Sequence, residues 1–188
     1  MNANTSKLLS RDRTMARLVK RYGPVPERKR PVFGALIRAV VSQMLSGSAA
    51  SAILGRIEKR VGFDPGKLSR VRTSTLRGLG LSNSKAECIR RLAKLALQGE
   101  FDDLAALSDD EILTRLTAIK GIGPWTAQMV LLGALGRPDV WPVGDGGVQR
   151  AARNLYGVEL DELEELGERF RPYRSYASWY FWQSLEMK

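Results

Sequence analysis

The sequence predicts an all-α protein, and three observations support this prediction. Apolar residues recur three and four positions apart along most of the chain, which is typical of helices that bury one face. No segment has the alternation of apolar and polar residues expected of a half-buried strand. Glycine, proline, serine and aspartate mark short connections between the periodic segments. With 188 residues, 44% of them hydrophobic, the chain is long enough to bury the core of one domain or of two small lobes.

The predicted helices begin and end at residues with the chemistry of helix caps. Pro31 stands near the start of the first one, where a missing N–H costs little. Ser82 or Ser84 can cap the helix that stops at Gly99, and Ser108 with Glu111 has the spacing of a capping box. The expected helices span 33–45, 47–62, 82–99, 108–119, 124–135, 145–157, 160–170 and 172–187.

The net charge favours a polyanionic partner. Lysine and arginine number 30 against 20 aspartate and glutamate residues, a formal charge of +10. Nucleic acid and an anionic membrane surface both attract such a chain, and a soluble protein that is merely basic is the alternative. No apolar run reaches the length of a membrane span, and the start, MNANTSKLLSRDRT, lacks the apolar core of a signal peptide. We therefore expect a cytoplasmic protein, or a nuclear one in a eukaryote, with no membrane partner.

Two residue types are nearly or wholly absent from the chain. It contains no histidine, so any catalysis must rest on carboxylates, lysine, tyrosine, hydroxyls or the backbone. Its single cysteine, Cys88, falls on an apolar helical stripe and is expected to be a small buried side chain. One cysteine excludes an internal disulfide, a cysteine zinc site and an iron–sulfur cluster held by the chain. We expect no cofactor.

The stretch IKGIGPWTAQ, residues 119–128, places two glycines and a proline immediately before a predicted helix. Gly121 and Gly123 permit a tight reversal, and Pro124 fits the first helical turn. The product is a helix N-terminus that no side chain covers, which is a natural site for a phosphate. A plain turn between two core helices is the alternative. The net positive charge and the flanking amphipathic helices favour phosphate binding.

Several motifs in the same order resemble the helix-hairpin-helix DNA glycosylases. The segment LTAIKGIGPWTAQMVLLGALGRPDVWPVGDGGVQRAARNLYG is similar to the family's signature. LIRAVVSQMLSGSAA is similar to its early helix-loop-helix, GLGLSNSKAECIRRLA to its middle helix and FRPYRSYASWYFW to its last helix. The resemblance covers about residues 30–185 and is to the alkylation-repair branch, the 3-methyladenine DNA glycosylase II type.

The resemblance implies one glycosylase domain over 1–188, an all-α, two-lobed fold with a DNA cleft between the lobes. The first lobe is expected at about 82–157, with the hairpin at 119–124, and the second at about 10–81 plus 158–188. It also implies a monofunctional hydrolase of base excision repair, which cuts the N-glycosidic bond of an alkylated purine flipped out of duplex DNA and leaves an abasic site. We expect a monomer whose partner is double-stranded DNA containing alkylated bases.

Asp145 is the candidate catalytic residue. From its place before a predicted helix it can be an ordinary N-cap, and the resemblance places the family's catalytic aspartate at this position. Both roles can coexist, because a helix N-terminus favours an ionised carboxylate. An alkylated purine carries positive charge and leaves without a strong general acid, which agrees with the missing histidine. One carboxylate can then stabilise the oxocarbenium character of the sugar or orient the attacking water.

Three residues are candidates for the base pocket. Lyase-active relatives carry a lysine where this chain has Trp125, so the resemblance implies that the strand is not nicked. Tyr173 aligns with an aromatic that lines the pocket in some relatives, and a stack with Trp125 would favour a cationic base. Met129 lies one helical turn beyond Trp125 and replaces an aromatic found in some relatives. Core packing is the alternative for Trp125.

The candidate wedge, which fills the gap left by the flipped base, follows Gln43. The resemblance points to Met44, where relatives commonly carry glutamine, with Leu45 as the second candidate. Gln43 is expected to face the DNA or to brace this loop. The alternative for Met44 is that it simply ends the apolar stripe of the 33–45 helix.

Phosphate contacts are expected from the hairpin backbone around Lys120, Gly121, Ile122 and Gly123. Lys120 and Arg150 can add charge attraction, with a solvated surface as the alternative for each. No metal is required. The resemblance implies only that a monovalent cation can sit at Gly121 and Gly123, between the carbonyls and a phosphate.

The last predicted helix is rich in aromatic residues. Trp179, Tyr180, Phe181 and Trp182 are expected to be core residues. Arg174, near the start of this helix, is expected to brace the aspartate loop or the backbone.

Two other functions stay open at the sequence level. One is a non-catalytic DNA-binding module, which would have no chemical need for Asp145. The other is a glycosylase for another base, such as uracil or mismatched adenine; the missing cluster cysteines and Trp125 disfavour the endonuclease-III-like branch. The lesion itself is open among 3-methyladenine, 7-methylguanine, ethenoadenine and hypoxanthine.

Overall fold

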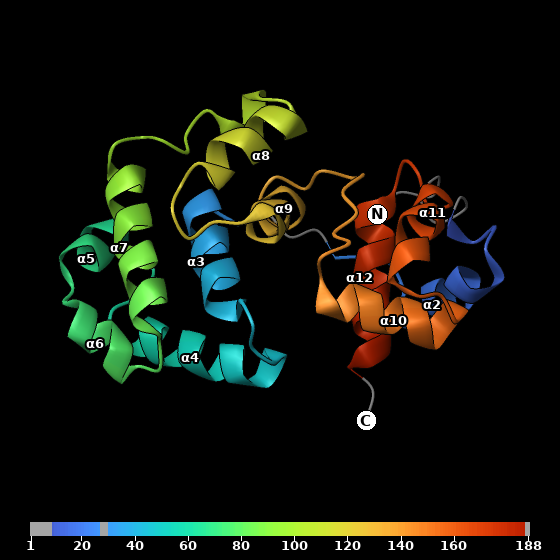
Figure 1. Ribbon diagram of the computed structural model, residues 1–188, viewed down its shortest axis with the longest axis horizontal. Helices are drawn as coiled ribbons and strands as arrows, with labels where there is room; N and C mark the ends of the chain where they lie inside the picture. The colour runs from blue at the N-terminus through green and yellow to red at the C-terminus, as the bar shows by residue number, and fades with distance from the viewer. Residues whose placement is uncertain (1–8, 27–29, 187–188) are drawn as a thin grey trace. The chain divides into compact units, whose positions relative to one another are not determined.

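The computed structural model describes residues 9–26 and 30–186. All regular elements in these two ranges are helices, so the all-α prediction is confirmed (Figure 1). None of the helices in the described part of the chain has the length and apolar character needed to span a bilayer.

The chain divides into two compact units. One consists of residues 29–135, and the other of the N-terminal stretch up to residue 28 together with 136–188. These limits differ from the lobes expected at 82–157 and at 10–81 plus 158–188. The reason is packing: the helices of residues 32–78 pack on those of 83–133, whereas the helix that follows Asp145 packs on the last helix of the chain.

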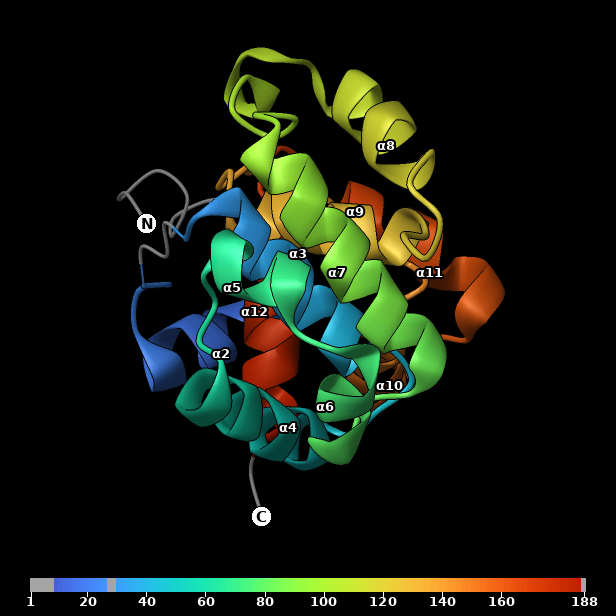
Figure 2. The ribbon, with the colours of Figure 1, turned by 90° about the vertical axis from the view of Figure 1, so that its left-hand side faces the viewer.

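The 29–135 unit is built around its first helix. α3 lies between α7 and α9 (Figures 1 and 2) and buries apolar side chains on most of its surface. α5 and α6 cover α7, and α8 packs on α9. The elements are α3 (Val32–Ser42), α4 (Gly47–Arg60), α5 (Pro65–Arg70), α6 (Thr73–Gly78), α7 (Asn83–Leu97), the 3-10 turn η1 (Leu104–Ala106), α8 (Asp109–Thr117) and α9 (Pro124–Gly133).

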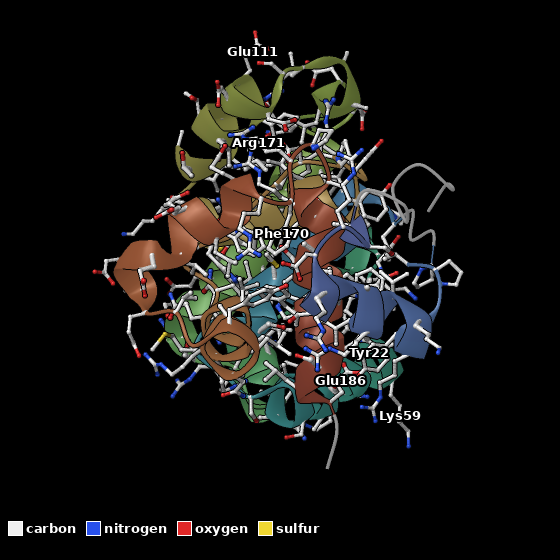
Figure 3. The ribbon with its side chains drawn as sticks, turned by 90° about the vertical axis from the view of Figure 1, so that its right-hand side faces the viewer. Tyr22, Lys59, Glu111, Phe170, Arg171 and Glu186 are labelled. Carbon is white, nitrogen blue, oxygen red and sulfur yellow. The ribbon has the colours of Figure 1, made fainter. Side chains whose placement is uncertain are left out.

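The other unit has an aromatic core around its last helix. α12 packs against α2 and α10. Trp141, Phe170 and Phe181 meet edge to face or tilted, with ring centroids 5.5 to 5.9 Å apart, and Phe170 lies inside this core (Figure 3). The elements are α2 (Arg13–Tyr22), α10 (Gly146–Tyr156), the 3-10 turn η2 (Leu160–Glu162), α11 (Leu163–Glu168) and α12 (Arg174–Leu185).

The predicted caps are largely confirmed, whereas α2 and the short helices α5 and α6 were not foreseen. Ser82 caps α7, and Ser108 with Glu111 forms the capping box of α8. α5 and α6 have six residues each, too few to show a helical period in the sequence. The helix predicted over 33–45 ends at Ser42, so its last three predicted residues form a loop instead. The prediction that Cys88 is buried is confirmed.

Asp12 fixes α2 to the rest of its unit. Its Oδ1 accepts the backbone N–H groups of Thr14 and Met15 and the hydroxyl of Tyr156, each at 2.8 or 2.9 Å. Its Oδ2 pairs with Arg169 at 2.5 Å. One carboxylate therefore both caps α2 and joins it to the far end of the chain, because Tyr156 ends α10 and Arg169 follows α11.

Tyr180 makes the contact between the end of α2 and α12 sensitive to alkaline pH, because the stability that the contact contributes falls as the pH rises above 10. Its hydroxyl donates to the Gly23 carbonyl oxygen at 2.7 Å, and burial raises the pKa of the phenol from 10 to about 12. Below pH 10 the phenol is protonated in the folded and unfolded chain alike, so its stabilisation is complete. Between pH 10 and about 12 only the unfolded chain loses this proton, so the free energy of unfolding falls as the pH rises.

We expect Tyr180→Phe to remove this part of the alkaline loss of stability. The check is urea unfolding from about pH 9 to about pH 12, comparing the slope of the unfolding free energy with that of the wild type. Near neutral pH the variant should lose about 1 kcal/mol with the hydrogen bond. A variant with the wild-type slope would show that Tyr180 does not contribute to it.

Candidate functional site

Asp145 is held at the N-terminus of α10. Its Oδ1 accepts the backbone N–H of Val148 at 2.8 Å, which confirms the N-cap prediction. The same oxygen accepts the indole N–H of Trp182, from α12, also at 2.8 Å. The residue is 8% exposed, between Gly144 and Gly146, which are both exposed. The carboxylate is thus fixed by two donors in a largely desolvated place, where its charge acts strongly on a nearby group.

Gly147 allows this close packing. A Cβ at this position would lie 2.9 Å from Asp145 Oδ1 and 2.9 Å from Trp182 Cδ1, closer than real Cβ contacts. A Cβ at Gly146 would have no atom within 4 Å. The two glycines that follow the aspartate therefore differ: only Gly147 is required by its surroundings.

The segment leading to Asp145 is anchored at its start by α12. The guanidinium of Arg174 donates to Asp139 Oδ1 at 2.8 Å and to Asp139 Oδ2 at 3.1 Å. The hydroxyl of Ser175 donates to the Arg137 carbonyl at 2.6 Å and accepts the N–H of Val140 at 2.9 Å. The expectation that Arg174 braces the aspartate loop is confirmed, through Asp139.

The middle and end of this segment are also held. The indole N–H of Trp141 donates to the Leu163 carbonyl at 2.9 Å. The side-chain amide of Gln149 donates to the Val143 carbonyl at 2.7 Å, and the N–H of Asp145 to the Pro142 carbonyl at 2.9 Å. The backbone that carries the carboxylate is fixed before any ligand binds.

Trp182 is the site residue that sequence reasoning missed. Of the four aromatics expected to be core, Tyr180 and Phe181 are buried, which confirms that expectation for them. Trp179 and Trp182 are only half-buried, and Trp182 hydrogen-bonds the candidate catalytic carboxylate. The sequence signal was weak: Phe181 and Trp182 are adjacent, so on a helix they point in different directions.

The residues predicted for the base pocket fall in both units. Trp125 and Met129 lie four residues apart on α9, so they share one face of that helix, and both are half-buried. Tyr173 is half-buried, precedes α12 and meets Tyr176 edge to face at 5.9 Å, in the unit that carries Asp145. The stack of Trp125 on Tyr173 stays a prediction.

The predicted hairpin joins α8 and α9 (Figure 1), and Gly121 is indispensable to it. Its φ of +101° favours glycine, and a Cβ there would lie 2.8 Å from the Sγ of Cys88. Ile122 is buried and anchors the turn in the core of its unit. Arg91, from α7, donates to the Lys120 carbonyl at 2.8 Å.

Gly123 leaves the end of α9 uncovered. It is the N-cap of this helix, and no side chain caps the helix. Its φ is −98° and a Cβ there would have no atom within 4 Å, so neither conformation nor packing within the chain requires glycine. A backbone N-terminus next to Pro124, without a covering side chain, can receive an anion.

The loop after α3 presents two apolar side chains to solvent. Met44 is 101% exposed and Leu45 is 41% exposed, so the alternative that Met44 ends a buried stripe is wrong. The backbone φ of Met44 is +54°, in the left-handed region that residues other than glycine rarely adopt. Gln43 braces the loop, since its Nε2 donates to the Gly121 carbonyl at 3.1 Å and to Thr126 Oγ1 at 2.9 Å.

The predicted cation would bind carbonyl oxygens of the hairpin. Those of Lys120 and Gly121 accept donors from Arg91 and Gln43, so one acceptor direction of each is occupied by a protein group. Across the described part of the chain, no three His, Cys, Asp or Glu residues gather into a metal site. A monovalent cation at Gly121 and Gly123 stays a prediction.

Relatives carry names from one class of DNA repair. The chain is 34% identical over 151 residues to DNA-3-methyladenine glycosylase 1 of Schizosaccharomyces pombe. This match covers 76% of this chain and 66% of the yeast protein. The chain is also 29% identical over 162 residues to an alkylbase DNA glycosidase-like protein of the same yeast, covering 80% of this chain and 76% of the relative.

Solved structures of similar fold agree. The 3-methyladenine DNA glycosylase of Schizosaccharomyces pombe in complex with abasic DNA superposes with a TM-score of 0.90 and 30% identity, covering 98% of both chains. A DNA-3-methyladenine glycosidase from Bacillus halodurans gives a TM-score of 0.76 and 35% identity, covering 99% of this chain and 90% of its own. Residues 37–172 match the HhH-GPD superfamily of base excision DNA repair proteins, and the chain belongs to this superfamily.

Proposed function

We propose that the protein is a monofunctional DNA glycosylase for alkylated purines of the 3-methyladenine type. The observation that carries this proposal is the environment of Asp145. Its carboxylate is 8% exposed, accepts hydrogen bonds from Val148 and Trp182, and lies on a loop with further hydrogen bonds at Asp139, Val140, Trp141 and Val143. Relatives named for 3-methyladenine excision support the substrate class.

The chemistry follows from one carboxylate and no histidine. When the base is alkylated and cationic, it leaves as a neutral purine, so the enzyme need not protonate it. The electron pair of the N-glycosidic bond goes to the base, and positive charge develops on the sugar. A fixed carboxylate stabilises that charge more in the transition state than in the ground state, which accelerates the cleavage. Water then adds to the anomeric carbon and loses a proton, leaving an abasic site.

Each unit has a part in this proposal. In the 29–135 unit the uncovered end of α9 holds a DNA phosphate, and Met44 enters the stack when the base leaves it. Trp125 in this unit, and Tyr173 in the other, are each aromatic side chains of the kind that attracts a cationic base. Trp125 stands where lyase-active relatives have a lysine, so no Schiff base forms there and the strand stays intact. We also propose that the chain acts as a monomer, in the compartment that holds the chromosome.

The test is base release from duplexes, each with one modified base, followed by alkali. The panel is 7-methylguanine, ethenoadenine, hypoxanthine and uracil, with methylated duplex DNA as the source of 3-methyladenine. We expect strand breaks at alkylated purines only after enzyme and then mild alkali, because mild alkali breaks the strand at the abasic site that the enzyme leaves, whereas the duplex without enzyme stays intact. Breaks without alkali would show lyase activity, release of uracil alone would show another specificity, and no release would favour a binding module.

The two hairpin glycines should separate folding from DNA binding. Gly121→Ala is expected to lower the free energy of unfolding by about 2 kcal/mol or more, since it adds backbone strain and a clash with Cys88. Gly123→Ala should stay within about 0.5 kcal/mol of the wild type and still weaken DNA binding, because its Cβ lies at the proposed phosphate site. Urea unfolding and fluorescence anisotropy with an abasic duplex check both. Unchanged DNA affinity in Gly123→Ala would argue against a phosphate at this end of α9.

A further inference from the structure

The exposed Met44 is held in a backbone conformation that its own side chain does not stabilise. Its φ is +54°, and the side chain, 101% exposed, makes no packing that could offset the strain. Neighbouring contacts must therefore hold the loop. They come from Lys85 and Gln43, which are both at least partly buried.

Lys85 closes the C-terminal end of α3. Its Nζ donates to the Val41 carbonyl at 2.9 Å and to the Gln43 carbonyl at 2.6 Å. These carbonyls lie at the negative end of the helix dipole, where an ammonium group is favourable. Burial lowers the pKa of Lys85 from its ordinary value, in keeping with an ammonium group that faces the protein more than the solvent.

Gln43 ties the same loop to the hairpin. While its carbonyl accepts Lys85, its side-chain amide donates to the Gly121 carbonyl and to the buried Thr126. Gln43, the residue before Met44, is thus held through both its backbone and its side chain. Its side chain links the loop to the hairpin and to α9, whose N-terminus is proposed to hold the phosphate.

We propose that Lys85 is a positioning residue that acts through Gln43 to keep Met44 as a preformed wedge for duplex DNA. This inference rests on the proposed function. A wedge ordered in advance loses less conformational freedom when it enters the base stack. Lys85 itself has its ammonium directed at two carbonyls of its own chain, so its contribution is to geometry and not to a DNA contact.

The test compares two forms of one substrate, a 7-methylguanine oligonucleotide used single-stranded or annealed. In a duplex the base must leave the stack, whereas in a single strand it is far less constrained. We expect Lys85→Met to lower the single-turnover excision rate on the duplex by about tenfold and on the single strand by less than about twofold. The ratio of the two rates is insensitive to any inactive fraction of the preparation, so partial misfolding does not confuse it.

Three further variants complete the design. Lys85→Arg keeps the charge and the donors and should restore most of the duplex rate. Lys94→Met removes an exposed lysine from the same helix and should leave the ratio unchanged. In a Met44→Ala background, Lys85→Met should cost little more, because residues that act through one another are not additive.

An equal loss on both substrates, or an unreduced effect of Lys85→Met in the Met44→Ala background, would overturn the proposal. Either result would mean that Lys85 acts on stability, on phosphate contact or on the chemical step. A wild type that releases neither 7-methylguanine from these oligonucleotides nor 3-methyladenine from methylated duplex DNA would instead count against the proposed function.

Discussion

Asp145→Asn is expected to lower the single-turnover rate of base excision by about 100- to 1,000-fold. The substitution removes the negative charge and keeps the shape of the side chain. Without that charge, the cationic sugar is not stabilised when the glycosidic bond breaks. The measurement is release of an alkylated base from duplex DNA with enzyme in excess, so that binding and product release do not limit the rate.

The same substitution should leave the fold intact. The amide oxygen of asparagine can accept the N–H of Val148 and the indole N–H of Trp182, as Oδ1 of the aspartate does. Asparagine is also among the best N-cap residues. We expect unfolding free energies within about 0.5 kcal/mol of each other. Near-normal excision by a folded Asp145→Asn protein would eliminate the catalytic role of this residue.

Gly147→Ala is expected to reduce excision by about tenfold to 100-fold, because it displaces the carboxylate or the indole that holds it. The added Cβ would lie 2.9 Å from Asp145 Oδ1 and from Trp182 Cδ1, next to the hydrogen bond that the Trp182 indole N–H donates to this carboxylate. Affinity for an abasic duplex should change much less than the rate, since the hairpin and the Met44 loop lie in the other unit. Single-turnover rates and anisotropy titrations measure the two effects.

Gly146→Ala is the matched control for this prediction. It places the same methyl group one residue earlier, where nothing lies within 4 Å, at the first position of α10. Alanine there should be neutral, or stabilise the protein by up to about 1 kcal/mol, since it restricts the unfolded chain. If both alanine variants lose activity equally, the packing of Gly147 against the carboxylate is not the cause.

Helical periodicity predicted α3, α4, α7 to α10 and α12, whereas α2, with ten residues, was not among the predicted helices. It could not predict α5 and α6, which are six residues long, nor the end of α3 at Ser42. The apolar residues at 44 and 45 extend the buried stripe in the sequence. Only the structure shows that the chain turns away there and exposes them.

Parts of the candidate site could be predicted where a residue type has few structural roles in its local sequence context. Asp145 before a helix and Gly121 in a hairpin were both anticipated, and both occupy the expected local positions. The supporting contacts were not predictable. Trp182 reaches Asp145 across 37 residues and Lys85 reaches Val41 across 44, and no local pattern encodes such pairs.

The affinities for two abasic-site analogues show whether the Asp145 carboxylate stabilises a cationic sugar. A pyrrolidine analogue carries positive charge where the sugar develops it in the transition state, and a tetrahydrofuran analogue of similar shape is neutral. We expect the wild-type protein to bind a duplex with the pyrrolidine at least about tenfold more tightly than one with the tetrahydrofuran, and Asp145→Asn to bind the two equally. A wild type that does not distinguish them, or an Asp145→Asn protein that still does, would contradict a carboxylate at Asp145 that stabilises the cationic sugar.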